Sequence, residues 1–191
     1  MLNNNRNKTL TVIILLASFI FVITGCAADP IVSYVEEIEE KGIIVKIDEL
    51  DDDVQALYAE FDKIVRIDES SIEDFEKLIE MIDEFLAKQS NLIVTVENLN
   101  TSDEKVEEVN DYLVEALSKF KSATNYLYVL TDAMIELKDI EENPDREDIE
   151  EELNRIIIAI FEADEEFNKY IAESEEALDT WESMLNEHLE Q

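Results

Sequence analysis

The sequence is poor in glycine, cysteine and histidine, and each shortage excludes a class of protein. Its 191 residues include two glycines, one cysteine and one histidine. Two glycines cannot supply the phosphate loops of nucleotide-binding folds or the tight turns of β-rich folds. One cysteine excludes an intramolecular disulfide and a thiolate zinc cluster, and one histidine excludes the usual histidine-based metal sites. We therefore expect no resident metal, no cofactor and no enzymatic activity.

Basic residues are also scarce, which restricts the partners of the protein. There are 15 lysines and arginines against 49 aspartates and glutamates, a formal net charge of −34. Nucleic-acid binding depends on lysine and arginine contacts with phosphates, so this class of partner is excluded. The hydrophobic content of 46% places the chain outside the disordered class, and the length suits one folded domain.

The first 25 residues predict a secretory signal peptide. Arg6 and Lys8 precede an apolar run of 14 residues over 10–23, interrupted only by Thr11 and Ser18. A basic start, an apolar core and small residues at the end are typical of export signals. The run is shorter than the roughly 20 apolar residues of a membrane-spanning helix. Removal of this peptide leaves 13 bases against 49 acids, a formal charge of −36.

The only cysteine, Cys26, follows directly on Ile23, Thr24 and Gly25, and this motif resembles the lipobox of bacterial lipoproteins. The resemblance implies that signal peptidase II recognises residues 23–25 and cleaves before Cys26, whose sulfur then carries diacylglycerol. Each buried CH₂ contributes about 0.8 kcal/mol, so two acyl chains hold a protein that one would not. We predict a tether to the outer face of the bacterial cytoplasmic membrane. The alternative is an uncleaved anchor in which Cys26 has no role.

The remaining chain predicts long helices, because only Gly42, Pro30 and Pro144 interrupt it. Asp29 and Pro30 are a typical helix start, and Gly42 is a typical stop. We expect helices over about 30–41, 44–68, 71–99, 103–141 and 146–189.

Capping motifs divide these helices. Ser70 with Glu73, and Ser71 with Asp74, have the spacing of capping boxes and favour two helices over 44–99, although one continuous helix is the alternative. We predict another capping box at Thr101 with Glu104. The residues Asn143-Pro144-Asp145 are expected to end one helix and cap the next.

Apolar residues recur at alternating steps of three and four, which is a heptad pattern. In the segment 71–99 this seam reads Ile72, Phe75, Ile79, Ile82, Leu86, Gln89, Ile93 and Val96. Additional apolar neighbours widen the last seam, as expected for a bundle core. They are Ile157, Phe161, Leu178 and Leu185.

Short connections between long helices predict antiparallel neighbours. We expect an all-α fold, an elongated antiparallel bundle of three or four long helices, with tight turns near 100 and 144. Residues 26–42 would form a membrane-proximal short helix, and residues 43–191 the bundle domain. A dimer through the same seams remains an alternative.

The residues that could form a metal, catalytic or binding site are better explained by structural roles. The acidic runs, such as 51–53 and 150–152, lack the loop of a calcium site and predict solvated helix faces. His188 is expected to be a packing or surface residue. The polar seam residues Gln89 and Ser174 are expected to fix the helix register. We expect core packing for the aromatic residues at helical spacing, Phe161, Phe167, Tyr170 and Trp181.

Three short segments, with the lipobox, resemble the cell-wall-binding lipoproteins of Gram-positive, spore-forming bacteria. They are Leu57-Tyr58 followed by Phe61-Asp62-Lys63-Ile64-Val65, the run Lys119 to Leu137 with Tyr126 and Tyr128, and Glu166-Phe167-Asn168-Lys169-Tyr170. The resemblance implies an extracytoplasmic, non-enzymatic, all-helical lipoprotein of the envelope, and it transfers no catalytic residue. The family tends to be rich in lysine, whereas here acids outnumber bases by more than three to one.

Two functions follow as hypotheses. The first is a lipid-anchored, non-enzymatic interaction module that contacts an envelope protein or a cell-wall component, with a small-molecule substrate not expected. The second is a cation-dependent ligand-binding or hydrolytic surface lipoprotein that uses an acidic bundle face. A periplasmic-type substrate-binding lipoprotein does not fit, because alternating strands are missing.

Overall fold

The computed structural model describes residues 29–66, 70–144 and 149–189. This part of the chain contains helices and no strands, which confirms the all-α prediction. The helices are α2 (Pro30–Glu40), α3 (Ile43–Arg66), α4 (Ile72–Glu97), α5 (Glu104–Glu142) and α6 (Ile149–Leu189). Among these described helices, none is both long and apolar enough to cross a bilayer.

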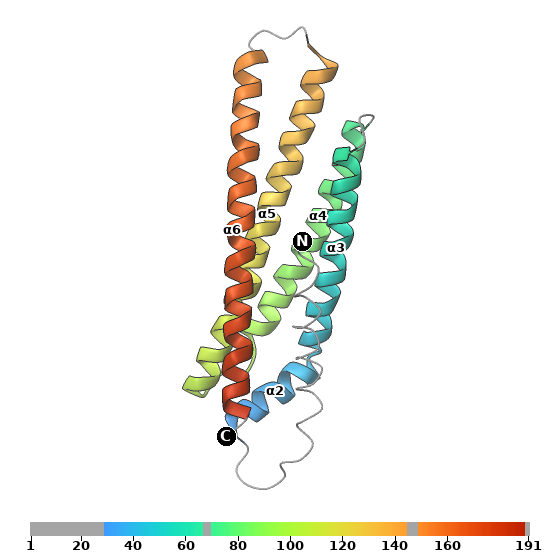
Figure 1. The fold of residues 1–191 in the computed structure, drawn as a ribbon. Helices are drawn as coiled ribbons and strands as arrows, with labels where there is room; N and C mark the ends of the chain where they lie inside the picture. Colours follow the sequence, from blue (N-terminus) through green and yellow to red (C-terminus); the bar gives the residue numbers. More distant parts are fainter. Residues whose placement is uncertain (1–28, 67–69, 145–148, 190–191) are drawn as a thin grey trace.

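The four long helices form an antiparallel bundle in which each packs against the next along the chain (Figure 1). The short helix α2 lies across one end, where it contacts α3, α5 and α6. We call this end the base; it holds α2, the α4–α5 turn and the C-terminal end of α6. Helices α5 and α6, with 39 and 41 residues, are each about 60 Å long and extend beyond the tip of the α3–α4 hairpin (Figure 1). The predicted elongated bundle is confirmed.

The ends of α2 are set by the residues that the sequence indicated. The Asp29 side chain accepts a hydrogen bond from the backbone N–H of Ile31 at 2.9 Å, and Pro30 begins the helix. Gly42 separates α2 from α3 with a φ of 61°, a left-handed conformation that glycine adopts without cost. Its N–H donates to the carbonyl of Glu39 at 3.0 Å.

We expect Gly42→Ala to lower the free energy of unfolding by about 1 kcal/mol, because a Cβ is strained in the left-handed region. No heavy atom lies within 4 Å of that Cβ, so the cost comes from the backbone alone. Gly42→Asn should cost less, since asparagine tolerates this conformation. Urea unfolding of residues 27–191 measures both. Equal costs for alanine and asparagine would contradict the backbone explanation.

Residues 43–97 form two helices, which resolves the alternative of one continuous helix. The N-cap of α4 is Ser71, which forms a capping box with Asp74 as predicted. The Asp74 carboxylate accepts from the Ser71 N–H at 3.0 Å, and this holds the pKa of Asp74 below its usual value. The predicted box at Ser70 is wrong, because the Ser70 hydroxyl donates to the carbonyl of Ile64 instead.

The other predicted caps need one correction. The N-cap of α5 is Asp103, whose carboxylate accepts from the N–H of Lys105 at 3.0 Å, so the predicted box at Thr101 with Glu104 is wrong. An aspartate directly before the helix is a cap of comparable strength. Asn143 ends α5 as expected, with its N–H bonded to the carbonyls of Asp139 and Ile140. Asp145, the predicted cap of α6, lies outside the described residues.

A continuous core runs through the bundle, and a smaller cluster lies in the far part of α5 and α6. The buried seam of α4 differs from the predicted one at every second position. There the buried residue comes one place earlier in the chain, at Leu78, Phe85 and Leu92. Ile79, Leu86 and Ile93, the predicted members, are only partly buried. Both seams satisfy the same heptad spacing, so the pattern alone did not distinguish them.

On α6 the prediction of a wide core stripe is wrong for two of its four members. Leu185 is buried and Leu178 is partly buried, but Ile157 and Phe161 are exposed on the outer face. The reason is that α5 covers only the side that carries Ile156 and Ala163.

Candidate functional site

The predicted lipidation site, Cys26 with Ile23, Thr24 and Gly25, lies outside the described residues. The described chain begins at Asp29 and enters α2 at once. The apolar face of this helix is buried, as predicted, through Ile31, Tyr34, Val35 and Ile38. The nearest described structure to the predicted anchor is therefore the base of the bundle.

A buried polar group joins three helices at the base. The Tyr34 hydroxyl of α2 donates to Asn110 Oδ1 of α5 at 3.1 Å, and Asn110 Nδ2 donates to the Val96 carbonyl of α4 at 3.3 Å. Burial raises the pKa of Tyr34 far above its usual range, and the indole of Trp181 beside it opposes the shift in part. The hydroxyl therefore stays protonated and acts as a fixed donor. Sequence reasoning missed Asn110, although it lies beside the seam residues Val109 and Leu113.

A second polar contact ties α2 to the α4–α5 turn. The Glu37 carboxylate accepts from Lys41 Nζ at 2.7 Å and from the Asn100 N–H at 3.0 Å. The Lys41 side chain and the Asn100 amide lower the pKa of Glu37, so it is ionised at neutral pH. Together with the hydrogen bond of Tyr34, this contact holds α2 against the bundle.

One carboxylate at the base lies in an unfavourable environment. Glu182 on α6 has a buried oxygen, Oε1, that makes no hydrogen bond. Burial, and then the negative charge of Asp179, raise the pKa of Glu182 to about 7. A carboxyl with this pKa changes its charge near neutral pH. Sequence spacing gave no signal for it, because the cause is burial at the bundle end.

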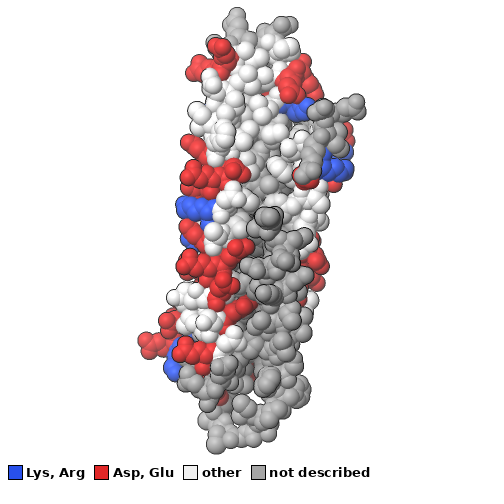
Figure 2. All heavy atoms as spheres, in the orientation of Figure 1, with Lys and Arg blue, Asp and Glu red and all other residues white. Residues whose placement is uncertain are grey.

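The rest of the acidic charge is spread over the helices. Figure 2 shows acidic side chains along the length of the visible face and few basic ones. Among the described residues, no group of three histidine, cysteine, aspartate or glutamate side chains is placed to hold a metal ion. A hollow of about 510 Å³ on α6 is bordered by Glu175, Glu176 and Asp179, but these carboxylates do not converge.

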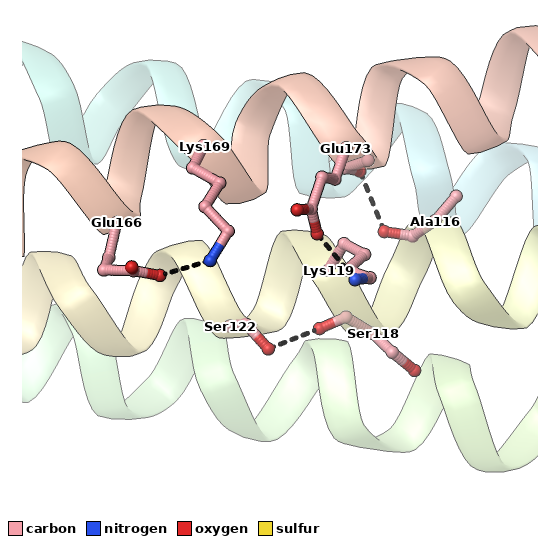
Figure 3. A network of polar contacts seen from close by, with 8 residues as sticks. Ala116, Ser118, Lys119, Ser122, Glu166, Lys169 and Glu173 are labelled. Atoms are coloured by element: carbon pink, nitrogen blue, oxygen red, sulfur yellow. Dashed lines mark hydrogen bonds and ion pairs between the residues drawn. The ribbon is translucent and has the colours of Figure 1, made fainter.

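The most developed polar contacts lie between α5 and α6 (Figure 3). Lys119 pairs with Glu173 at 2.6 Å across the two helices, and Lys169 pairs with Glu166 at 2.9 Å within α6. Both ammonium groups approach the ring of Tyr170, at 5.5 and 5.0 Å from its centroid. This ring also stacks on Tyr126 at 5.7 Å. These contacts are exposed or half-buried, and those between the two helices favour one register of α5 against α6.

The predicted register residues do contact neighbouring helices. Ser174 Oγ donates to the Ala116 carbonyl at 2.8 Å, and Gln89 Nε2 donates to Thr124 Oγ1 at 3.0 Å. Gln89 is buried, and its Oε1 has no partner. The first bond joins α6 to α5 and the second joins α4 to α5, which agrees with a register role.

The predicted aromatic set divides into separate places. Trp181 is buried at the base, with 2% of its surface exposed. Phe167 packs edge-on against Tyr58 of α3 at 6.0 Å, and Tyr170 joins the α5–α6 contacts. Phe161 is 71% exposed, so core packing is wrong for this residue. The side chain of His188 lies outside the described residues.

Comparison with known proteins does not add a family to this description. The chain matches no protein family, no curated protein and no solved structure. Its class is therefore defined by its own geometry, which is an all-α, up-and-down helical bundle with a strongly acidic surface.

Proposed function

We propose that the protein is a lipid-anchored, extracytoplasmic helical lipoprotein that acts as a non-enzymatic interaction module of the bacterial envelope. The observation that carries this proposal is Cys26, the only cysteine, placed directly after Ile23-Thr24-Gly25 at the end of an apolar run. The resemblance to envelope lipoproteins of Gram-positive, spore-forming bacteria agrees with it. Contact with an envelope protein or with the cell wall is the role that such an anchor would serve.

The packing of α2 supports this proposal. Pro30, the first residue of α2, is four positions after Cys26, so the backbone of the lipid-bearing residue would lie no more than about 14 Å from Pro30. Because Tyr34 and Glu37 hold α2 against the bundle, an anchor next to α2 would be attached to the whole bundle. The far end of α5 and α6 would then be available for contact away from the membrane.

The charge supports an exposed position for the bundle. After removal of residues 1–25, a chain with 49 acids against 13 bases repels anionic lipids and anionic wall polymers. A bundle tethered at its base would therefore stand away from the membrane surface. For this chain, contact with a wall polymer would need more than charge, which favours a protein partner.

The anchor is tested by Cys26→Ala in the full-length chain expressed in a Gram-positive host. We expect loss of labelled fatty acid and either release of the protein or accumulation of an unprocessed form with residues 1–25 attached. Cell fractionation and intact mass measure both effects. Ser18→Ala, a change within the apolar run, is the matched control and should leave processing intact. An unchanged membrane fraction and unchanged mass for Cys26→Ala would overturn the proposal.

A further inference from the structure

Three large apolar side chains meet on the outer face of α6, and this is where we place a docking surface. Ile157 is 45% exposed, Ile158 is 56% exposed and Phe161 is 71% exposed. Positions 157 and 161, and positions 158 and 161, are four and three apart, so the side chains are neighbours on one helix face. We call these three residues the α6 apolar patch. Single exposed valines occur on α3, α4 and α5, but in the described chain only α6 gathers three large apolar residues this way.

The patch is not an extension of the core. The opposite side of the same turns carries Ile156 and Ala163, which are buried. The largest apolar patch on a single protein is typically on the order of a few hundred Å² and is often a contact site. Uncharged surface covers the upper part of α5 and α6 in Figure 2, between acidic side chains.

Acidic side chains border the patch at both ends. Glu150 and Glu151 lie seven positions before Ile157 and Ile158, and Glu162 and Glu165 follow on the same face; all four are exposed. The basic side chain next to the patch, Arg155, forms an ion pair with Glu136 of α5 at 2.6 Å. A second copy of this chain would bring like charges together, as would an anionic lipid surface.

We propose that the α6 apolar patch docks an amphipathic helix of a partner protein, with apolar residues facing Ile157, Ile158 and Phe161 and basic residues facing the bordering glutamates. A helix presents apolar residues at steps of three and four, which match the spacing of this patch. Its basic flanks would pair with Glu162 and Glu165 on one side and with Glu150 and Glu151 on the other. This inference rests on the proposed function, because it names the partner chemistry of the interaction module.

A synthetic leucine–lysine peptide of about 18 residues, patterned as an amphipathic helix, is a suitable probe. Fluorescence anisotropy with residues 27–191, which contain every described helix, measures its affinity at about 0.15 M NaCl. We expect I158S/F161S to weaken binding by at least about tenfold, because central aromatic and aliphatic anchors carry most of the binding free energy. The matched variant V45S/V94S, at exposed valines of α3 and α4, should change affinity by less than about twofold.

A pair of charge variants separates local pairing from bulk attraction. E162Q/E165Q and E175Q/E176Q remove the same charge from exposed positions of α6, and only the first pair borders the patch. We expect a larger loss of affinity for the first pair. Equal losses, equal binding of a peptide with the same composition but scattered leucines, or no binding by the wild-type chain would overturn the proposal.

Two further outcomes would also overturn it. If light scattering finds a dimer that I158S/F161S dissociates, the patch belongs to self-association. If an envelope pull-down recovers the same protein with the wild-type chain and with I158S/F161S, the interaction module stands and this docking surface does not.

Discussion

Replacing Trp181 with alanine is expected to lower the free energy of unfolding by about 3–5 kcal/mol. The indole is 2% exposed and belongs to the continuous core at the base, beside Tyr34 of α2. Removing it leaves a cavity where α2 and α6 meet, and the rigid bundle can close that cavity only in part. Urea unfolding of residues 27–191 measures the change.

Two control variants give this prediction its specificity. Trp181→Phe should cost less than about 2 kcal/mol, because phenylalanine keeps most of the volume of the buried side chain. Phe161→Ala removes an exposed aromatic from the same helix and should change stability by less than about 0.5 kcal/mol. A cost below about 1 kcal/mol for Trp181→Ala would contradict the packing of α2 on α6.

Glu182→Gln is expected to stabilise the protein at alkaline pH and to have no effect at acidic pH. The pKa of Glu182 is about 7 in the folded protein against an ordinary 4.5, so between these values the folded protein keeps a proton that the unfolded chain has released. Ionisation therefore costs the folded state, and the stability of the wild-type chain falls as the pH rises through this window. Glutamine resembles the protonated form and avoids the cost.

The expected gain is about 1–2 kcal/mol at about pH 8, less than the whole shift implies because the side chain keeps some contact with solvent. It should shrink through the window and vanish below about pH 4.5. Unfolding in urea over a pH series measures the difference between variant and wild type. Glu175→Gln, at an exposed position of the same helix, removes one charge without this burial. A difference that does not vary with pH would contradict the assignment to Glu182.

Much of the fold could be predicted because it follows from local rules. Asp29, Pro30 and Gly42 set the ends of α2, and the heptad spacing placed the long helices. The choice between Ile79 and Leu78 as core residues could not be made, because both belong to a stripe wider than one seam. Only the position of the neighbouring helix decides which edge of such a stripe is buried.

Less of the candidate surface could be predicted, for a related reason. The run Ile156-Ile157-Ile158-Ala159-Ile160-Phe161 is apolar on every side of a helix, so some of it must face outward when one neighbour covers it. The sequence contains this signal, but it does not tell which side is left open. The contacts of Tyr170 with Lys119 and Lys169 depend on the register between α5 and α6, which spacing within one helix does not determine.

The two ends of the described chain meet at the base, and this has a consequence for the order of folding. Helices α3 to α6 each pack on the next, so their contacts can form in sequence, and bundles with such local contacts fold in microseconds to milliseconds. Tyr34 of α2 is different, because its cover includes Trp181, which is synthesised near the end of the chain. If the chain is exported unfolded, as the proposed function implies, the base would close only after the end of α6 has emerged. A truncated copy that lacks the end of α6 would leave Tyr34 without the cover of Trp181.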